Sequence, residues 1–202
     1  MTIRKGEAWG EPGCLPEGGV VVRSDAEARA VVEDARRHCR PYPALGLLGG
    51  DLCRTLGGPG DEARLWSPQA VRFRVDLGEA LVDGVLRLFV AHLVAHSRTW
   101  RRCLVAMNAQ WRGEWNLGPR AHPNDGLLDT YDARLGTRDL VLVRRRLHHG
   151  THLPHPGIIE HRAAAAQIDL GRTLVLELDG QRLGRARVVS LRVEPDALTV
   201  VV

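Results

Sequence analysis

The chain has 202 residues, 44% of them hydrophobic, which predicts one globular domain or slightly more with a sizeable hydrophobic core. The net charge is only +4, aromatic residues make up 4% of the chain, and no nucleic-acid-binding motif occurs, so the composition does not indicate a nucleic-acid partner. Basic character of this size allows weak attraction to anionic lipid headgroups or to phosphate.

The four cysteines are Cys14, Cys39, Cys53 and Cys103. They stand far apart in the sequence and form no Cys-x-x-Cys pair, which indicates a reducing compartment. The N-terminus lacks the apolar segment of a signal peptide, and no apolar run is long enough to span a bilayer. We therefore expect a soluble cytoplasmic protein without a transmembrane segment, with at most peripheral membrane contact.

Glycine and proline are frequent in residues 1–19, which predicts an irregular arm. Residues 20–66 then alternate strand and helix patterns, which predicts a truncated, Rossmann-like α/β unit with a parallel pair of strands. The predicted elements are a strand at 20–22, a helix capped by Ser24 or Asp25 that ends near Arg40, a strand at 44–48, and a short helix opened by Gly49-Gly50-Asp51.

Residues 67–202 have the pattern of an all-β segment. Short strands with turns at regular spacing predict an antiparallel two-sheet β-sandwich, so the whole chain is expected to be α+β. The turn signal Asn124-Asp125-Gly126 joins two extended runs and predicts a long hairpin. The predicted strands lie at 71–76, 86–91, 102–107, 140–146, 163–170, 173–178, 187–193 and 198–202.

Several short motifs follow one another in the last half of the chain: Asn108-Ala109, Arg112-Gly113, Pro119, Asn124-Asp125-Gly126-Leu127-Leu128-Asp129, Leu178-Asp179-Gly180-Gln181 and Val193-Glu194-Pro195-Asp196-Ala197-Leu198. In this order they resemble the diacylglycerol kinase and bacterial lipid kinase family, a relative of the sphingosine kinases. The resemblance implies a nucleotide-binding-like unit followed by a β-sandwich, in a truncated and divergent form. The family's first strands and helices, and its long helical lid after Val90, have no counterpart here.

The resemblance aligns the family's Gly-Gly-Asp-Gly-Thr nucleotide motif with Arg23-Ser24-Asp25-Ala26-Glu27, where only the aspartate remains. Glycines let backbone N–H groups approach a phosphate, so their replacement by larger residues, with Glu27 beside them, predicts weakened ATP binding. A second nucleotide motif has shrunk to the stretch around Gly49-Gly50. The candidate cofactor-binding residues are Asp25, Arg23, Gly49, Gly50, Asp51 and Asn108.

Gln181 stands where the family has the acidic residue that acts as general base on the lipid hydroxyl. An amide cannot accept that proton at neutral pH, and alternation along the chain does not aim Asp179 at the same point. We therefore expect a non-catalytic accessory protein that binds a lipid or a phosphorylated small molecule, as a monomer or a homodimer. The alternative is an active ATP-dependent lipid kinase that uses Asp179 or another acid, with a phosphate cradle rebuilt around Arg23 or Gly49-Gly50.

The resemblance also implies a structural divalent cation, held by one aspartate and two main-chain carbonyl groups. These positions correspond to Asp125, His122 and Leu127. One carboxylate with carbonyl groups and water suits Mg²⁺. The alternative, without a bound ion, is that Asp125 only forms an Asx-type turn.

Three further groups of residues have competing interpretations. The first is a histidine-rich stretch, made of His148, His149, His152 and His155, which offers a zinc or nickel site as a third function. A solvated loop is favoured, because no cysteine or acidic residue completes the ligand set nearby except Glu160, with His161 beside it. His92 and His96 share a face of either a helix or a strand and are expected at the core edge or surface. Trp111 and Trp115 are packing residues or the lining of an apolar groove.

Overall fold

The computed structural model describes residues 9–202. The helices are α1 (Asp25–Arg37), α2 (Asp51–Thr55), α3 (Glu62–Leu65) and α4 (Thr137–Arg146), followed by the 3-10 turn η1 (Leu147–His149). The strands are β1 (Glu11–Pro12), β2 (Val20–Val22), β3 (Leu45–Leu47), β4 (Val71–Val82), β5 (Val85–Phe89), β6 (His92–His96), β7 (Arg102–Met107), β8 (Trp111–Arg112), β9 (Trp115–Asn116), β10 (Leu128–Arg134), β11 (Ile158–Ala163), β12 (Ala165–Leu178) and β13 (Gln181–Val201).

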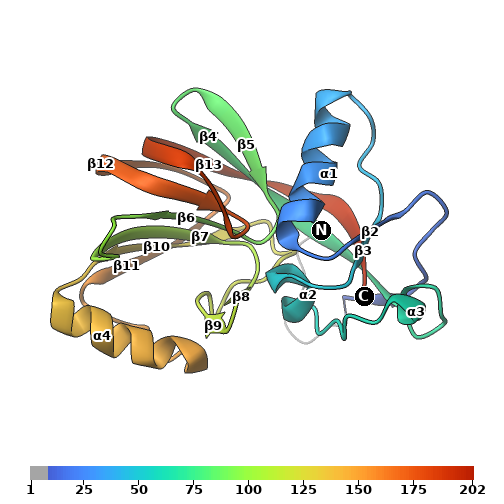
Figure 1. Ribbon diagram of the computed structural model, residues 1–202, viewed down its shortest axis with the longest axis horizontal. Coiled ribbons are helices and arrows are strands. Elements are labelled where there is room, and N and C mark those ends of the chain that lie inside the picture. Colours follow the sequence, from blue (N-terminus) through green and yellow to red (C-terminus); the bar gives the residue numbers. More distant parts are fainter. Residues whose placement is uncertain (1–8) are drawn as a thin grey trace.

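The N-terminal α/β unit forms as the sequence predicts, with β2 and β3 paired in parallel and α1 packed beside them (Figure 1). Ser24 is the N-cap of α1, and its hydroxyl accepts a hydrogen bond from the Glu27 N–H at 3.2 Å. The Glu27 carboxylate accepts in return from the Arg23 N–H at 2.7 Å. This arrangement is a variant of the capping box in which Glu27 reaches the N–H of the residue before the N-cap, and it satisfies two backbone donors at the start of the helix.

One hydrogen-bonded sheet connects this unit to the rest of the chain. In the described residues the sheet has 11 strands, with the central order β1-β4-β13-β12-β6-β7-β10-β11. The long strand β13 pairs with β4 along most of its length, and near its end Val200 lies opposite Leu45 of β3 in parallel. The last strand of the chain therefore fixes the α/β unit to the β-rich part.

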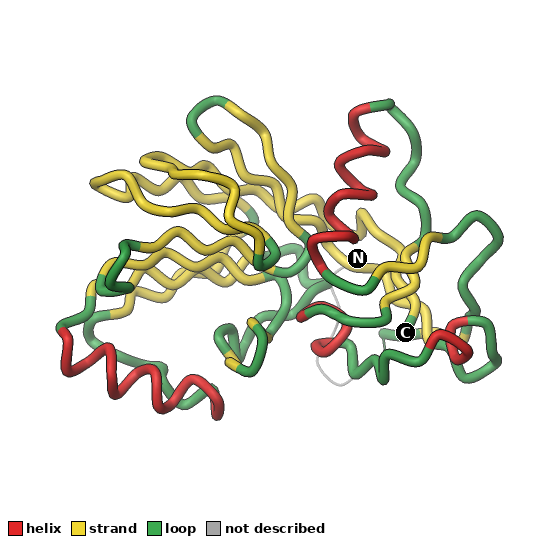
Figure 2. The backbone as a smooth tube through the Cα atoms, in the orientation of Figure 1, coloured by secondary structure: helices red, strands yellow, loops and turns green. Residues whose placement is uncertain are grey.

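The large sheet folds over on itself, so that β4, β5, β12 and β13 lie over β6, β7, β10 and β11 (Figures 1 and 2). The core between the two layers is made of buried side chains from both, among them Ala80, Phe89, Leu93, Leu104, Leu176, Leu178, Val189 and Leu191. The predicted α+β class is confirmed. The two sandwich layers are continuous through the β12–β6 pairing, and the small separate sheet consists of β8 and β9.

The segment 140–146, predicted as a strand, is part of helix α4. Its apolar residues Leu140, Val143 and Leu147 recur at helical spacing and pack against the sheet, whereas Val141 and Leu142 are exposed. A short apolar run does not distinguish strand from helix, which explains the error. The arginines at 144–146 lie in the last turn, where positive charge favours the helix dipole.

The remaining predicted strands are confirmed, but several are longer than expected. Predicted strands 163–170 and 173–178 form one strand, β12, whose pairing with β13 shifts between Asp169 and Leu174. Predicted strands 187–193 and 198–202 likewise merge into β13, with a shift between Glu194 and Leu198. These bulges interrupt the alternation of apolar and polar residues, so the sequence pattern reads each strand as two.

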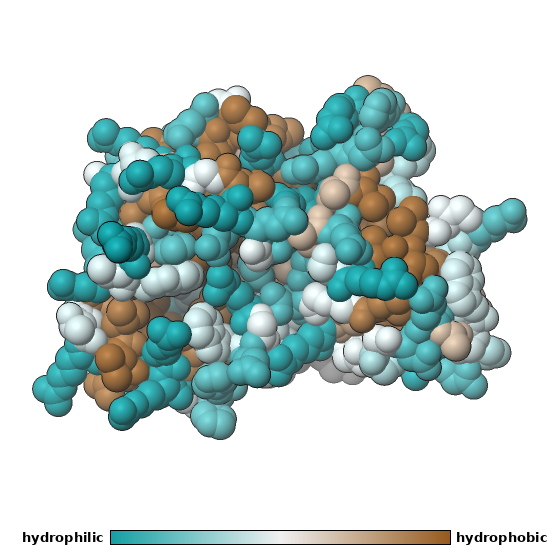
Figure 3. Space-filling model, viewed as in Figure 1, coloured by the Kyte–Doolittle hydropathy of each residue, from teal (hydrophilic) through white to brown (hydrophobic). Residues whose placement is uncertain are grey.

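Brown areas lie over the β4–β5 hairpin, near α4 and over the α/β unit (Figure 3), and the first two contain small groups of exposed apolar side chains. The first group is Leu81, Val85 and Leu86, and the second is Val141 and Leu142. Within residues 9–202 no helix combines the length and the apolar character needed to cross a membrane.

Replacing Gly78 by alanine tests the packing of the sandwich. An added Cβ would lie 2.2 Å from the ring of Phe89, the fully buried residue opposite it in the β4–β5 ladder. We expect Gly78→Ala to lower the free energy of unfolding by about 1–3 kcal/mol through overpacking. Denaturant unfolding measures this. The control is Gly13→Ala, whose Cβ meets only the end of the flexible Arg72 side chain; equal unfolding midpoints for the two variants would contradict the prediction.

Candidate functional site

A polar cleft lies where the α/β unit meets the sandwich. It has a volume of about 400 Å³ and is lined by Asp51, His92, Arg112, Gly113, Glu114, Trp115 and Gly180. The lining comes from the start of α2, from β6, from the β8–β9 hairpin and from the turn between β12 and β13. This junction brings together the two parts of the chain in which the sequence places its candidate residues.

Asp51 and His92 form a polar pair on the wall of this cleft. The His92 Nε2 atom lies 2.9 Å from one oxygen of the Asp51 carboxylate, and the Gly113 N–H donates to the other oxygen at 2.6 Å. A carboxylate accepts, so the pairing puts the proton of a neutral His92 on Nε2. His92 is 1% exposed, and its Nδ1 atom has no hydrogen-bond partner within residues 9–202.

Asp179 is buried behind the cleft and is held by backbone donors. Its carboxylate accepts from the N–H groups of Val90, Ala91 and His92 at 3.1, 2.9 and 3.1 Å. Asp179 has a φ of 50° in the β12–β13 turn, and Gly180 follows with a φ of 76°, as a tight hairpin turn requires. Burial raises the pKa of Asp179, while nearby His92 and the three N–H donors act in the opposite direction.

Asp25 is also buried, and it caps α2 rather than facing the cleft. Its carboxylate accepts from the N–H groups of Asp51 and Leu52 at 2.5 and 3.1 Å. Burial, together with the negative charge of Asp179, raises the pKa of Asp25 to about 7. Gly50 permits this approach, because a Cβ there would lie 2.5 Å from the Asp25 carboxylate and its φ is +95°.

Arg29 connects the buried Asp179 carboxylate to Gln181. It lies one turn after Asp25 on α1, and its side chain is 5% exposed. Its Nε is 3.7 Å from the Asp179 carboxylate, and its Nη2 donates to the Gln181 side-chain oxygen at 2.5 Å. The Gln181 amide oxygen is thus committed to a cation of the same chain.

The structure places the remaining candidate residues of the nucleotide motifs away from a shared site. The Arg23 guanidinium pairs with Glu62 at 3.3 Å on the exposed surface. A Cβ at Gly49 would lie 2.6 Å from the Arg23 carbonyl oxygen, so Gly49 serves close chain packing. Asn108 is fully buried and donates to the Asp76 and Val90 carbonyl groups at 2.9 and 2.8 Å, which gives it a structural position outside the cleft lining.

In the loop that carries the candidate cation ligands, the Asp125 carboxylate forms an ion pair with Arg162. One oxygen of Asp125 accepts from the Leu127 N–H at 3.0 Å, the Asx turn that the sequence offers as an alternative. The other oxygen accepts from Arg162. The His122 Nδ1 accepts from the Asn124 N–H at 3.2 Å. Since Arg162 already neutralises the single carboxylate, these residues in their present arrangement do not fit a divalent cation.

The imidazole rings of the histidine-rich stretch do not lie together in one site. His148 and His149 are exposed in η1, and the His155 Nδ1 accepts from the Gly157 N–H at 3.0 Å. His152 is only 3% exposed, so it departs from the expected solvated loop, and it bonds to the backbone of Leu117. No group of three or more histidine, cysteine or acidic side chains within residues 9–202 has the geometry of a metal site.

An apolar pocket of about 90 Å³ lies beneath α4, beside the cleft. Its lining includes Val105, Leu117, Ala133, Leu135, Leu140, Val143, Leu147 and Ile158, and it shares Arg112 and Trp115 with the cleft. Tyr131 and His152 also line it, and the Tyr131 hydroxyl and the His152 Nδ1 are buried without a partner within residues 9–202. Burial raises the pKa of Tyr131, so this hydroxyl stays protonated and keeps its donor capacity at neutral pH.

Sequence reasoning missed two residues of this region as site residues. Arg29 follows Asp25 at the i,i+4 spacing of one helix face, which was a usable signal. His92 shares a strand face with His96, as predicted, but both are buried, and His92 finds its partner Asp51 across the junction. Trp115 lines both cavities, as the groove interpretation expected, whereas Trp111 stacks on Arg54 with 3.8 Å between the guanidinium and the ring centre.

The raised pKa of Asp25 predicts how stability depends on pH. The folded pKa, about 7, lies above the ordinary value of 3.8, so between these pH values the folded state binds a proton that the unfolded state has lost. This group therefore stabilises the fold at low pH, and its contribution falls as the pH rises from about 4 to 7. We expect Asp25→Asn to flatten that part of the stability profile. Urea unfolding at stepped pH measures it, and an unchanged slope would contradict the assignment.

Comparison with known proteins agrees with this architecture. Residues 61–202 match the family described as the YegS C-terminal NAD kinase beta sandwich-like domain. No curated protein matches the sequence. Among solved structures, a putative diacylglycerol kinase from Bacillus anthracis str. Sterne is similar with a TM-score of 0.61 and 14% identity, over 79% of this chain and 69% of that one.

Two further structures from the same organism are similar over 79% of this chain. One is a putative diacylglycerol kinase, with a TM-score of 0.58, 13% identity and 69% of its length covered. The other is described as a diacylglycerol kinase, with a TM-score of 0.54, 15% identity and 66% of its length covered. At these identities the structures show a shared fold, and the resemblance drawn from the motifs is confirmed. Because the family match covers more than half of the chain, the protein belongs to the family of the YegS C-terminal NAD kinase beta sandwich-like domain.

Proposed function

We propose that this protein binds a diacylglycerol-like lipid without transferring phosphate to it. The observation that carries the proposal is that the acidic and amide groups beside the cleft are used in contacts within the chain. Asp25 and Asp179 accept backbone N–H groups, and Gln181 accepts from Arg29. A phosphoryl transferase needs a base within reach of the substrate hydroxyl and a held phosphate donor.

The described residues argue against a base at the family position. The Gln181 amide is not basic at neutral pH, and its oxygen is already bonded to a guanidinium. Asp179, the nearest carboxylate in sequence, has its oxygens occupied by three N–H donors and is buried. Neither group is available to a substrate hydroxyl in this arrangement.

The helix starts near the cleft also argue against ATP binding. Phosphates bind at free N–H groups of a helix N-terminus. At α1 the Ser24 hydroxyl accepts from the Glu27 N–H and the Glu27 carboxylate lies at the start of the helix, and at α2 the Asp25 carboxylate accepts from the first two N–H groups. A carboxylate in that position also repels phosphate. A structural Mg²⁺ at Asp125 stays a prediction that requires Arg162 to leave.

The apolar pocket beneath α4 supports a lipid as ligand. It adjoins the polar cleft through Arg112 and Trp115, so one molecule with a polar and an apolar end can contact both. The buried Tyr131 hydroxyl at this pocket is available for an ester or hydroxyl group. The closed volume takes only part of an acyl chain, and a longer chain requires α4 to move outward. Peripheral membrane contact and a homodimer stay predictions.

The alternative is an active ATP-dependent lipid kinase, and one observation favours it. The pair Asp51 and His92 lines the cleft, and a histidine oriented by a carboxylate is a common general base. This alternative needs a nucleotide site other than the start of α2, where Asp25 occupies the N–H groups, so binding of ATP distinguishes the two functions.

Titration of ATP with Mg²⁺ into the protein tests the non-catalytic proposal. We expect no binding heat at millimolar ATP and no transfer of phosphate to dioctanoylglycerol. Gln181→Glu restores the acidic residue and is also expected to stay inactive, because the donor site is missing. Micromolar ATP binding, or phosphate transfer that Asp51→Asn abolishes, would instead establish the kinase alternative with Asp51 and His92 as its acid–base pair.

Binding of dioctanoylglycerol tests the lipid site. Leu140 lines the pocket on one face of α4, whereas Leu142 is 41% exposed on another. We expect Leu140→Gln to weaken binding about tenfold, because it places an amide in the apolar wall, and Leu142→Gln to leave binding unchanged. Calorimetry or tryptophan fluorescence measures both. Equal affinities for the two variants would rule out the pocket as the lipid site.

A further inference from the structure

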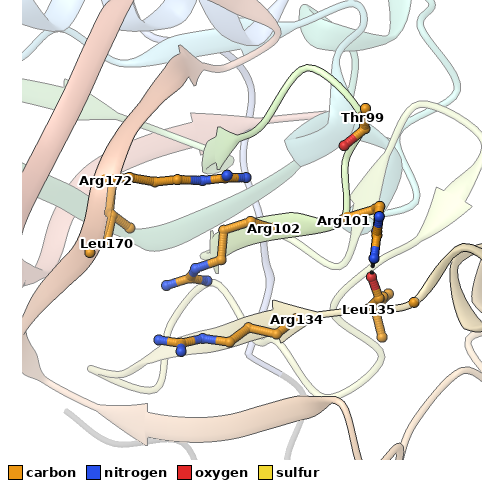
Figure 4. Close-up of a pocket in the computed structure, with 9 residues that line it drawn as sticks. Thr99, Arg101, Arg102, Arg134, Leu135, Leu170 and Arg172 are labelled. Atoms are coloured by element: carbon orange, nitrogen blue, oxygen red, sulfur yellow. Dashed lines mark hydrogen bonds between the residues drawn. The ribbon is translucent and has the colours of Figure 1, made fainter.

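A third cavity lies at the end of the sandwich opposite the α/β unit (Figures 1 and 4). It is open, with a volume of about 640 Å³, within the size range of small-molecule sites. Its wall is dominated by arginines from three parts of the chain: Arg101, Arg102, Arg134 and Arg172. None of these arginines lines the polar cleft.

The backbone forces two of these arginines together. In the β7–β10 ladder Arg102 lies directly opposite Arg134, and like charges in such a pair are destabilising. Arg172 joins them from β12, next to Gly171, whose φ is +72° in the bulge between Asp169 and Leu174. Bulges of this kind redirect side chains. Figure 4 shows the side chains of Arg102, Arg134 and Arg172 side by side.

The positive charge in this cavity is only partly neutralised. Arg102 forms a two-pronged pair with Asp132, and the Nε of Arg101 donates to the Leu135 carbonyl at 3.3 Å. Arg134 and Arg172 have no carboxylate partner among the described residues. The nearby Asp169 is engaged by the Gly171 N–H at 2.8 Å.

Helix α4 adds a further contribution at the rim. It begins after Gly136, which lines the cavity, and it has no side-chain cap. The N-terminus of a ten-residue helix carries partial positive charge, and Asp139 is the acidic residue of its first turn. The cavity thus combines guanidinium groups without partners and a helix start.

We propose that this arginine pocket binds a phosphate ester, through Arg134 and Arg172 with Arg102 as support. Guanidinium groups match phosphate oxygens with paired, charge-assisted hydrogen bonds. Leu135 lines both this cavity and the apolar pocket beneath α4, so the phosphate is either that of a soluble ester or the headgroup of a lipid whose chain lies in the apolar pocket. The site goes beyond the proposed function and does not depend on it.

The test compares two phosphate sources on the wild type and on the double variant Arg134→Gln/Arg172→Gln. Both side chains are exposed and carry no structural ion pair, so the variant is expected to fold. The soluble probe is glycerol 3-phosphate, measured by calorimetry, and the lipid probe is phosphatidylcholine vesicles with or without phosphatidic acid, measured by co-sedimentation. Arg185→Gln is the matched control, an exposed arginine on β13 that lies outside the pocket.

We expect the double variant to weaken binding of one probe about a hundredfold, roughly tenfold for each arginine removed, and the control to retain wild-type affinity. Loss with glycerol 3-phosphate identifies a soluble ester as ligand, and loss confined to phosphatidic acid vesicles identifies a headgroup. The proposal would be overturned if the wild type bound neither probe, or if the double variant and the Arg185→Gln control bound with equal affinity. Binding of uncharged dioctanoylglycerol by the double variant reports separately on the lipid site.

Discussion

The buried carboxylate of Asp179 holds the β12–β13 turn against the connection between β5 and β6, and it contacts the α/β unit through Arg29. It accepts three consecutive backbone N–H groups, from Val90, Ala91 and His92, at the point where β5 passes into β6. Hydrogen bonds to a charged acceptor contribute about 1.5–3 kcal/mol each, which offsets part of the cost of burying the charge, while burial still raises the pKa of Asp179. The β12–β13 turn, His92 and the cleft wall therefore hold one another in place.

The guanidinium of Arg29 contacts this buried acidic region. Arg29 stands between Asp179 and Gln181, and Asp25 lies close enough to Asp179 for their charges to interact. A glutamate at position 181 would compete with Asp179 for Arg29, whereas the amide of Gln181 accepts from it without adding charge. The amide suits a structural contact, and the same property removes a base from the cleft.

Local sequence signals predicted the elements whose residues act near one another in the chain. Ser24 marks the start of α1, and the turn signal Asn124-Asp125-Gly126 lies between the antiparallel strands β7 and β10. The errors have two causes. A short apolar run such as that of α4 fits both the helical and the strand periodicity of apolar residues. Bulges in β12 and β13 interrupt the alternation along each strand, so one strand has the pattern of two. The pairing of Asp51 with His92 was out of reach, because it joins residues 41 positions apart through tertiary packing alone.

The three cavities share lining residues: Arg112 and Trp115 line both the cleft and the apolar pocket, and Leu135 lines both the apolar pocket and the arginine pocket. Arg112 is also part of a network of side chains, because it donates to Glu177 at 2.7 Å and lies 5.3 Å from the centre of the Trp100 ring.

The same network reaches the β6–β7 turn, because Glu177 also contacts His96, whose ring stacks on Trp100 at 3.8 Å. That turn, at 97–101, stands where the resembling family has a long helical lid. It carries Arg101 into the arginine pocket and Trp100 into the apolar one. A ligand that displaces Trp100 or Arg112 therefore acts on the walls of the neighbouring cavities, so occupation of one site is physically connected to the shape of the next.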